Sequence, residues 1–351
     1  MSAWQIHSFG GPDVMQLRTV PIPVAGPGDV TIAVDACGVC RHDMLTREGA
    51  FPRAKLPVTL GHQVSGRVHE VGRDVLDMDL GQRVIVLPLV GCGECASCAG
   101  GNDAHCLRDN PRFLGEDYDG GYAEYVTVPE RAVVPLPDSI SAIDAAILCC
   151  TFGTAYHALS GRARVSPGEI VVITGASGGV GSHAIQVAKA LDLVVVAVVS
   201  SCRRAEVATA AGADHVIVSP KRDFAPAVRE TVGRRVDVVV DFVGGSLLSE
   251  SIRAVRTGGR VVVAGNVEGG EAQIAPGMII LKEVSLIGTK SVSGAEMSVV
   301  LDMVGAGVLT PQVGEIRPLS DARAVHEDLL TGFGRGRVVL GVTGAQVRAR
   351  S

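Results

Sequence analysis

The feature that most constrains the fold is the glycine-rich stretch TGASGGVG, Thr174 to Gly181. It lies between the apolar run EIVVIT, Glu169 to Thr174, and the helix-period run VGSHAIQVAKAL. Short Val- and Ile-rich runs then alternate with helix-like stretches up to about residue 288. Unbroken apolar strands are buried on both faces, which predicts a parallel sheet with crossover helices. We therefore expect a doubly wound α/β nucleotide-binding domain over residues 151–288.

Within this turn, the pattern A-x-G-x-x-G is typical of a dinucleotide-binding loop. Ala176 takes the position that allows a tight turn, Gly178 lets the backbone approach a pyrophosphate, and Gly181 allows close packing of helix and strand. Gly179 and Val180 lie between them and are expected to line the cofactor at the helix N-terminus, where N–H donors favour phosphate. The alternative, a purely structural glycine turn, is disfavoured by the complete series of strands and helices around it.

Cofactor choice is read about 20 residues further on, where an NAD site usually has an acidic residue. This chain has VVSSCRR, with Ser200 and Ser201 followed by Arg203 and Arg204. Without the acid, and with two cations nearby, the sequence favours NADP(H) over NAD(H). The alternative is that both arginines belong to the solvated face of the next helix.

Residues 1–150 have a different character, with short strands between Gly- and Pro-rich segments and little helical periodicity. This pattern predicts an irregular antiparallel β-barrel-like domain, to which residues 289–351 are expected to return.

The chain has nine cysteines among its 351 residues. Its N-terminus lacks the basic and apolar residues of a secretory leader, so we expect a cytoplasmic location. The cysteines are then expected to be metal ligands or free thiols rather than a disulfide framework. A net charge of −5 without a basic run argues against nucleic acid as a partner. The sequence contains no run of 18 apolar residues, so it predicts no membrane-spanning helix.

Four of the cysteines lie in one loop, CGECASCAGGNDAHC. Four thiolates can close a tetrahedral shell around zinc, which leaves no open position for a substrate, so this zinc would be structural. An iron–sulfur cluster or free thiols are the alternatives. The residues are Cys92, Cys95, Cys98 and Cys106, in a lobe at about 91–107.

A second short stretch, CGVCRHD from Cys37 to Asp43, is compatible with a zinc knuckle, a redox pair or one edge of a catalytic metal site. A catalytic zinc needs three protein ligands and an open fourth position. Cys40, His62 in GHQVSG and Cys150 in LCCTFGTAYHAL could supply them.

These motifs resemble the medium-chain, zinc-containing alcohol dehydrogenase family, in the family's order and over essentially the whole chain. The resemblance implies a GroES-like β-barrel catalytic domain, residues 1–150 and 289–351, and a Rossmann domain. It implies two zinc ions per chain, with Cys40, His62 and Cys150 holding the catalytic ion and Asp43 orienting His62. It also implies a small-molecule substrate and a homodimer or homotetramer.

Two positions depart from the family pattern. His42 stands where the family usually has a Ser or Thr that relays the alcohol proton, and Gln63 stands where it usually has Glu. An imidazole can also pass a proton, although His42 could instead turn away and only pack or bind a phosphate. Loss of the carboxylate at Gln63 would make the zinc more electrophilic.

The resemblance leaves three functions open. The first is zinc-dependent interconversion of an alcohol and an aldehyde or ketone by hydride transfer. The second is NADPH-dependent reduction of an enoyl thioester, because stretches such as LGEDYDGGYAEY are similar to a branch that includes acryloyl-CoA reductases. The third is a nucleotide-binding protein without catalysis. Kinship of fold does not by itself decide the chemistry.

Overall fold

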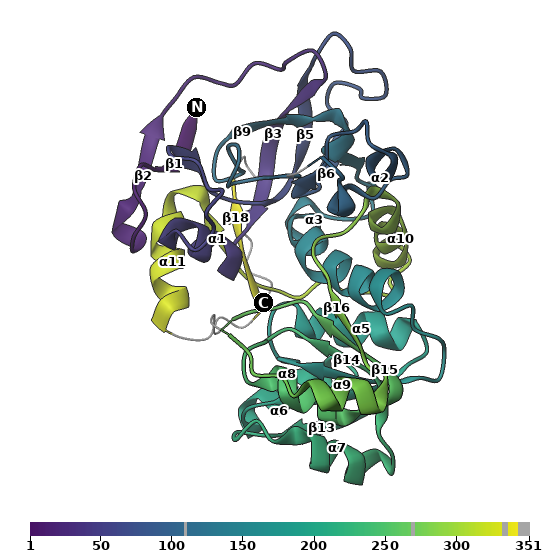
Figure 1. The fold of residues 1–351 in the computed structure, drawn as a ribbon. Coiled ribbons are helices and arrows are strands. Elements are labelled where there is room, and N and C mark those ends of the chain that lie inside the picture. Colours follow the sequence, from purple (N-terminus) through teal and green to yellow (C-terminus); the bar gives the residue numbers. More distant parts are fainter. Residues whose placement is uncertain (109–110, 268–270, 332–335, 343–351) are drawn as a thin grey trace. The chain divides into compact units, whose positions relative to one another are not determined.

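A computed structural model describes residues 1–351 except 109–110, 268–270, 332–335 and 343–351. The chain forms two compact units (Figure 1). The first comprises Met1–Cys149, Val292–Ala306 and Pro311–Ser351, and the second comprises Cys150–Ser291 and Gly307–Thr310. Residues 343–351 of the segment expected to return to the first domain lie outside the described residues.

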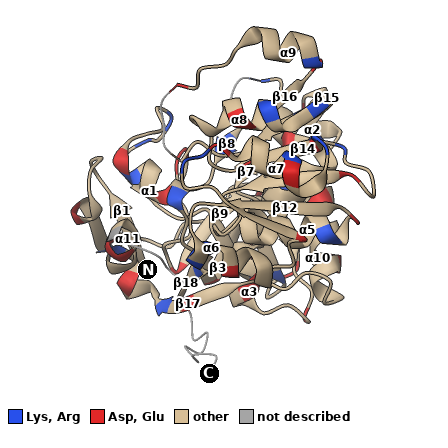
Figure 2. Cartoon of the chain, turned by 90° about the horizontal axis from the view of Figure 1, so that it is seen from below, with Lys and Arg blue, Asp and Glu red and all other residues tan. Residues whose placement is uncertain are grey.

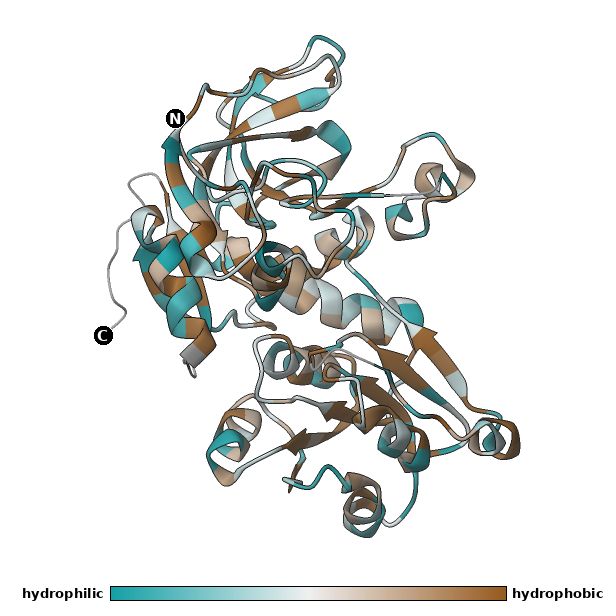
Figure 3. Cartoon of the chain, turned by 60° about the vertical axis from the view of Figure 1, so that its left-hand side comes forward, coloured by the Kyte–Doolittle hydropathy of each residue, from teal (hydrophilic) through white to brown (hydrophobic). Residues whose placement is uncertain are grey.

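The second unit contains a six-stranded parallel sheet. Its strands are β11 (Ile170–Thr174), β12 (Val194–Val199), β13 (His215–Val218), β14 (Val236–Asp241), β15 (Val255–Val263) and β16 (Ser285–Gly288). Their order in the sheet is β13-β12-β11-β14-β15-β16, with every pair parallel. The order reverses at β11, which is the doubly wound arrangement predicted from the sequence. Every residue of β11 and β14 is buried, which explains the apolar runs IVVI and VVV within them; the sheet's strands are largely brown in Figure 3.

Helices connect these strands. They are α5 (Gly181–Ala190), α6 (Cys202–Ala210), α7 (Phe224–Val232), α8 (Leu247–Ala254) and α9 (Pro276–Lys282), while α4 (Thr154–Tyr156) and a π-helical turn at His157–Arg162 precede β11. Crossovers from β11 run in opposite directions along the sheet, so right-handed connections place helices on both of its faces.

The first unit is built on antiparallel strands. They are β1 (Ser2–Ile6), β2 (Met15–Thr19), β3 (Asp29–Gly38), β4 (Val58–Thr59), β5 (Gln63–Val71), β6 (Arg83–Val86), β7 (Leu89–Val90), β8 (Arg112–Phe113), β9 (Tyr125–Pro129), β10 (Val133–Pro135), β17 (Val313–Pro318) and β18 (Arg337–Gly341). The main sheet has the order β10-β6-β5-β3-β18-β17, with β9 also pairing with β3. β17 and β18 pair in parallel, and β18 joins β3 antiparallel. The GroES-like β-barrel and Rossmann fold class predicted from the sequence is therefore confirmed.

The described part of the first unit also contains five α-helices. They are α1 (Arg41–Glu48), α2 (Ala96–Ala99), α3 (Ala142–Leu148), α10 (Gly294–Gly305) and α11 (Ala322–Thr331). Short 3₁₀ turns lie at Pro12–Val14, Asp103–His105, Glu130–Ala132 and Leu319–Asp321.

The helical segment that starts with α3 is long and apolar. Residues Ala142–Arg162 would suffice to cross a membrane by length and composition, but 67% of their most apolar window is buried inside the protein. Ala146 and Ile147 of α3 pack against Ala36 of β3 and Val339 of β18. α3 therefore packs on the barrel. Figure 2 shows charges of both signs interspersed along the chain.

Candidate functional site

Three residues predicted as metal ligands come together. One ligand atom from each of Cys40, His62 and Cys150 lies within 4.8 Å of the other two. Cys40 is the N-cap residue of α1, and His62 directly precedes β5. Cys150 directly follows Cys149 in a π-helical turn, Cys149–Gly153, of the helical segment that starts with α3. π-Helical turns inside helices frequently mark functional sites.

The turn before His62 depends on a glycine. Gly61 has φ +100°, and a Cβ built there would lie 2.4 Å from the Tyr122 ring and 2.9 Å from Cys37 Sγ. A side chain at this position would therefore displace the segment that carries His62. Cys37 itself is fully buried, as a packing residue should be.

Asp43 fixes the orientation of His62. Its Oδ1 lies 2.7 Å from His62 Nδ1, and its Oδ2 accepts a hydrogen bond from the Cys40 backbone N–H at 2.9 Å. Because Nδ1 donates to the carboxylate, Nε2 is the ring nitrogen available to a metal. A ligating histidine typically donates its other N–H to a carboxylate in this way.

The protonation of His62 also depends on Asp43. Burial alone lowers the pKa of His62, but the charge of Asp43, its hydrogen bond and Cys40 together raise that pKa to about 10. Without a metal, the ring therefore holds a proton on each nitrogen at neutral pH. A metal must displace the proton on Nε2, so metal binding at this site releases protons.

The residues fit a zinc ion with an open position. Two thiol sulfurs and one imidazole nitrogen are ligands that zinc prefers, and three protein ligands are typical of its catalytic sites. Gln63, next to His62, is fully buried, and neither its Oε1 nor its Nε2 has a hydrogen-bond partner among the described residues. A buried amide without a partner is costly, so a bound molecule at this position would satisfy it.

His42 lies beside this cluster but is held by groups that the sequence did not point to. Its Nε2 pairs with Oε1 of Glu116, a carboxylate that is 2% exposed. Its ring stacks on Phe51 with 4.4 Å between ring centroids and lies 4.5 Å from the ring of Phe113. The centroid of the His62 ring is 5.0 Å away. His42 is thus fixed next to a candidate metal ligand, with one ring nitrogen engaged.

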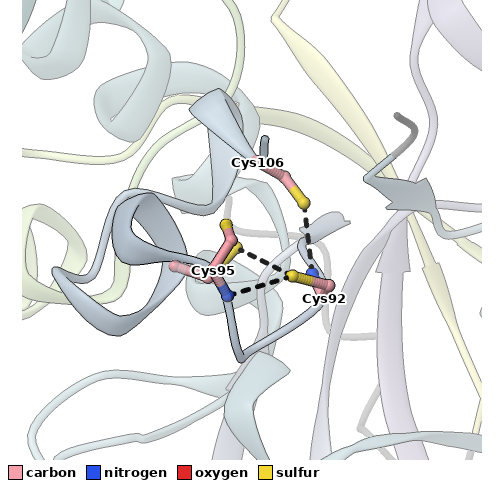
Figure 4. A group of neighbouring side chains, drawn as sticks. Cys92, Cys95 and Cys106 are labelled. Carbon is pink, nitrogen blue, oxygen red and sulfur yellow. Dashed lines mark hydrogen bonds between the residues drawn. The ribbon is translucent and has the colours of Figure 1, made fainter. Parts of the chain in front are cut away.

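The four-cysteine loop also closes into a cluster (Figure 4). The four sulfurs lie within 4.8 Å of one another, and those of Cys92 and Cys98 are 3.9 Å apart. Tetrahedral zinc–thiolate bonds of about 2.3 Å place sulfurs about 3.8 Å apart, so the loop matches that geometry. Hydrogen bonds from the backbone N–H groups of Leu107 and Cys98 lower the pKa of Cys95 to about 6. Cys95 therefore favours the thiolate, the form that binds zinc, whereas burial raises the pKa of Cys98 to about 12.

The glycine-rich turn joins β11 to α5 where the sequence predicts it. A Cβ at Gly181 would lie 2.2 Å from the Gly175 carbonyl oxygen and 2.8 Å from Ala176 Cα, so only glycine fits. The left-handed residue of the turn is Gly175, with φ +59°, rather than Ala176. Gly178, Gly179 and Val180 lie between Ala176 and the first residue of α5.

The end of β12 carries the residues expected to set cofactor choice. Ser200 follows the last residue of β12, and Ser201 is the N-cap residue of α6, whose first turn contains Arg203 and Arg204. The first turn of α6 contains no acidic residue. The loop that follows β12 therefore lacks the carboxylate that would repel a 2′-phosphate.

Sequence reasoning missed Glu116, Tyr122 and His326. Glu116 and Tyr122 lie in LGEDYDGGYAEY, which carried the resemblance to one branch of the family but no chemical role. His326 lies on α11, far along the chain from the ligands. The sequence spacing of these three residues indicates no role, because only the fold brings them close to the ligands.

Comparisons with known proteins agree with this arrangement. Residues 26–138 match the alcohol dehydrogenase GroES-like domain, and residues 179–308 match the zinc-binding dehydrogenase family. An NAD-dependent alcohol dehydrogenase of Sulfolobus acidocaldarius is 34% identical, over 98% of this chain and 100% of the relative. An acryloyl-coenzyme A reductase of Metallosphaera sedula is 35% identical, over 93% of this chain and 96% of the relative.

A solved structure also has the same fold. The crystal structure of AibC matches with a TM-score of 0.92 at 40% identity, and the match covers 97% of this chain and 96% of that one. The chain belongs to the zinc-containing alcohol dehydrogenase family of medium-chain dehydrogenases/reductases.

Proposed function

We propose that this protein is a zinc-dependent oxidoreductase that interconverts an alcohol and an aldehyde or ketone by hydride transfer with NADP(H). The observation that carries this proposal is the buried cluster of Cys40, His62 and Cys150, with Asp43 bonded to His62. Zinc at this cluster would polarise the substrate oxygen, and the nicotinamide would carry the hydride.

Residues of the chain would orient a metal ligand and move the proton of the substrate. Asp43 holds the His62 ring so that Nε2 faces the ligand cluster. Nε2 of His42 donates to Glu116, which leaves Nδ1 as the nitrogen that would accept the proton of an alcohol or return it to a carbonyl. Thr46 Oγ1 donates its single proton to the His42 carbonyl oxygen at 3.0 Å and lies 3.4 Å from Glu116 Oε1, so its side chain packs beside the carboxylate that holds His42.

Two features support the proposed cofactor site. Gly178, Gly179, Val180 and Gly181 would hold the pyrophosphate at the start of α5. Ser200, Ser201, Arg203 and Arg204 would bind the ribose and its 2′-phosphate, because serine hydroxyls donate hydrogen bonds and arginine pairs with phosphate. The S. acidocaldarius relative is called NAD-dependent, so NADH is the competing cofactor in every assay.

The four-cysteine cluster would hold a second, structural zinc. Cys92, Cys95, Cys98 and Cys106 supply four sulfurs, so this ion would have no open position. We also propose a cytoplasmic homodimer or homotetramer. The edge strand β16 and helix α9 expose large apolar side chains, with Leu286 42%, Ile280 72% and Leu281 82% exposed. Apolar edges of this kind are commonly covered by a partner.

A second candidate function is reduction of an enoyl thioester with NADPH. The position of the usual hydroxyl relay is taken by His42, which Glu116, Phe51 and Phe113 hold in place. The M. sedula relative is called an acryloyl-coenzyme A reductase. The two functions differ in product, which is an alcohol in one case and a saturated acyl group in the other.

A turnover screen tests the proposal. Purified protein is assayed with NADPH and NADH against aldehydes, ketones and enoyl-CoA thioesters, together with Cys150→Ala and its neighbour Cys149→Ala. Cys149 is buried and bonds Val86 and Met297, outside the ligand cluster. We expect carbonyl reduction that Cys150→Ala lowers by at least about 100-fold, beyond the 10–100-fold loss typical of outer-shell changes. Cys149→Ala should retain most of the activity.

Three results would overturn parts of this proposal. Enoyl reduction without carbonyl or alcohol activity would favour the second candidate function. A strong preference for NADH would contradict the NADP(H) assignment. One zinc ion per chain and no turnover would indicate a nucleotide-binding protein without catalysis.

A further inference from the structure

A chain of buried polar side chains leads away from the candidate metal site. It consists of Asp43 and Arg47 on α1, Tyr122 in the segment before β9, and His326 on α11. Arg47, Tyr122 and His326 are 0% exposed, and Asp43 is 2% exposed. Buried polar groups of this kind are costly unless each is paired, so their pairing can be followed atom by atom.

The chain begins at the Arg47 guanidinium. Its Nη1 lies 3.0 Å from His326 Nδ1, its Nε donates to the Gly10 carbonyl at 3.0 Å, and its Nη2 pairs with Glu48 at 2.7 Å. A guanidinium only donates, so Nδ1 of His326 must accept and the ring proton is on Nε2. Burial and the nearby Arg47 lower the pKa of His326 to about 4, which is consistent with a neutral ring.

The next two hydrogen bonds are donated in the same direction along the chain. His326 Nε2 lies 3.1 Å from the Tyr122 hydroxyl, and that hydroxyl donates to Asp43 Oδ2 at 3.3 Å. A tyrosine O–H has one proton, so the bond from His326 must be donated to the phenol oxygen. Every donor from Arg47 onward therefore points toward Asp43, and aligned hydrogen bonds polarise one another.

Asp43 is the point where this chain meets the metal ligands. Its Oδ1 takes the Nδ1–H of His62 and its Oδ2 takes the backbone N–H of Cys40, in addition to the Tyr122 hydroxyl. Two ligands are thus bonded to one carboxylate, and the position of that carboxylate is set partly by Tyr122.

We propose that Tyr122 and His326 are positioning residues of the metal site, which fix the Asp43 carboxylate and, through it, the metal affinity of Cys40, His62 and Cys150. This inference rests on the proposed function, because it assumes that the cluster binds zinc. It extends the site to α11, which contributes no metal ligand.

The test measures metal binding rather than turnover. Tyr122→Phe keeps the ring that packs against Gly61 and removes only the hydroxyl. Tyr118→Phe is a matched control, because the Tyr118 hydroxyl is buried and has no hydrogen-bond partner among the described residues. The zinc Kd of each of the two sites is measured by competition with a chromophoric chelator, and the cobalt-substituted proteins are compared by absorption spectroscopy.

We expect Tyr122→Phe to weaken the three-ligand site by about tenfold or more, the usual scale for outer-shell partners, and to alter its cobalt spectrum. The four-cysteine site should keep its affinity, and Tyr118→Phe should leave both sites unchanged. His326→Leu should reproduce the loss, whereas His326→Gln should recover part of it because its amide N–H can donate to Tyr122. If Tyr122→Phe does not fold, the two His326 variants still test the proposal.

Two contrary results are distinguishable. If the wild type binds two zinc ions and all variants bind them with unchanged affinity, the inference is wrong and the proposed function stands. If the wild type binds zinc only at the four cysteines, the proposed function and this inference both fail.

Discussion

At the scale of single residues, the protonation of the candidate ligands makes metal uptake a proton-releasing event. Asp43 and Cys40 raise the pKa of His62 to about 10 against the opposing effect of burial, so His62 is protonated at neutral pH without metal. We predict that zinc added to the metal-free protein releases protons, measured with a pH indicator in weak buffer. His62→Gln should release fewer protons per zinc bound, and equal release would contradict this prediction.

Asp43 should matter for metal binding more than for the fold of α1. Asp43→Asn keeps the side-chain volume and removes the charge that the Nδ1–H of His62 faces. We expect about 10–100-fold weaker zinc binding at the three-ligand site, measured by chelator competition. Asp144→Asn changes an N-cap partner of α3 and serves as the control, with unchanged zinc affinity.

Glu116 should control the proton transfer assigned to His42. Glu116→Gln removes the carboxylate that His42 Nε2 faces. We expect kcat for alcohol oxidation to fall by about 100-fold, within the usual contribution of acid–base catalysis, with a smaller change in KM. Glu130→Gln, an acid that bonds the Leu76 and Asp77 amides elsewhere, is the control. Equal kcat values for wild type and Glu116→Gln would exclude this role.

At the scale of elements, the turn between β11 and α5 requires glycine at the first residue of the helix, Gly181. Gly181→Ala would place Cβ 2.2 Å from the Gly175 carbonyl oxygen. We predict a loss of stability of about 1–3 kcal/mol, the range for overpacking, together with weaker NADPH binding. Gly277→Ala is the matched control, since a Cβ there meets nothing within 4 Å. Chemical unfolding and cofactor titration measure the two effects.

The elements of the second unit could be predicted closely because burial on both faces produces unbroken apolar runs. β13 has the bounds of the apolar run HVIV, and β11 and β12 start one residue after the runs EIVVIT and LVVVAVV begin. The structure differs where polar residues interrupt a strand. β15 begins at Val255, whereas the apolar run RVVVAG that indicates a strand begins only at Arg260. The exposed residues Arg256 and Thr257 interrupt the apolar pattern in the first part of the strand.

The site could be predicted where residue spacing or the family resemblance carries a signal. The two cysteine motifs and the glycine-rich turn are local patterns, so their residues could be named from the sequence. The partners of His42 and Asp43 could not, because Glu116 and Tyr122 come from segments far from α1. The π-helical turn that carries Cys150 also gave no signal, since its residues continue an ordinary apolar helix pattern.

At the scale of the whole molecule, the two cysteine-containing clusters predict two zinc ions of different lability. Zinc at the three-ligand site would keep an open position, whereas zinc at the four cysteines would not. Mild chelation should therefore remove one ion per chain first and abolish turnover, while the protein stays folded by circular dichroism. Simultaneous loss of both ions with unfolding would contradict this order.

The central claim is that the Cys40–His62–Cys150 site, when it holds zinc, reduces carbonyl substrates with NADPH. The most direct test is the rate of NADPH-dependent carbonyl reduction as zinc is returned to protein from which the labile ion has been removed. We predict a negligible rate at one zinc per chain and full recovery as the second ion binds. A rate that does not change as the second ion binds would contradict it.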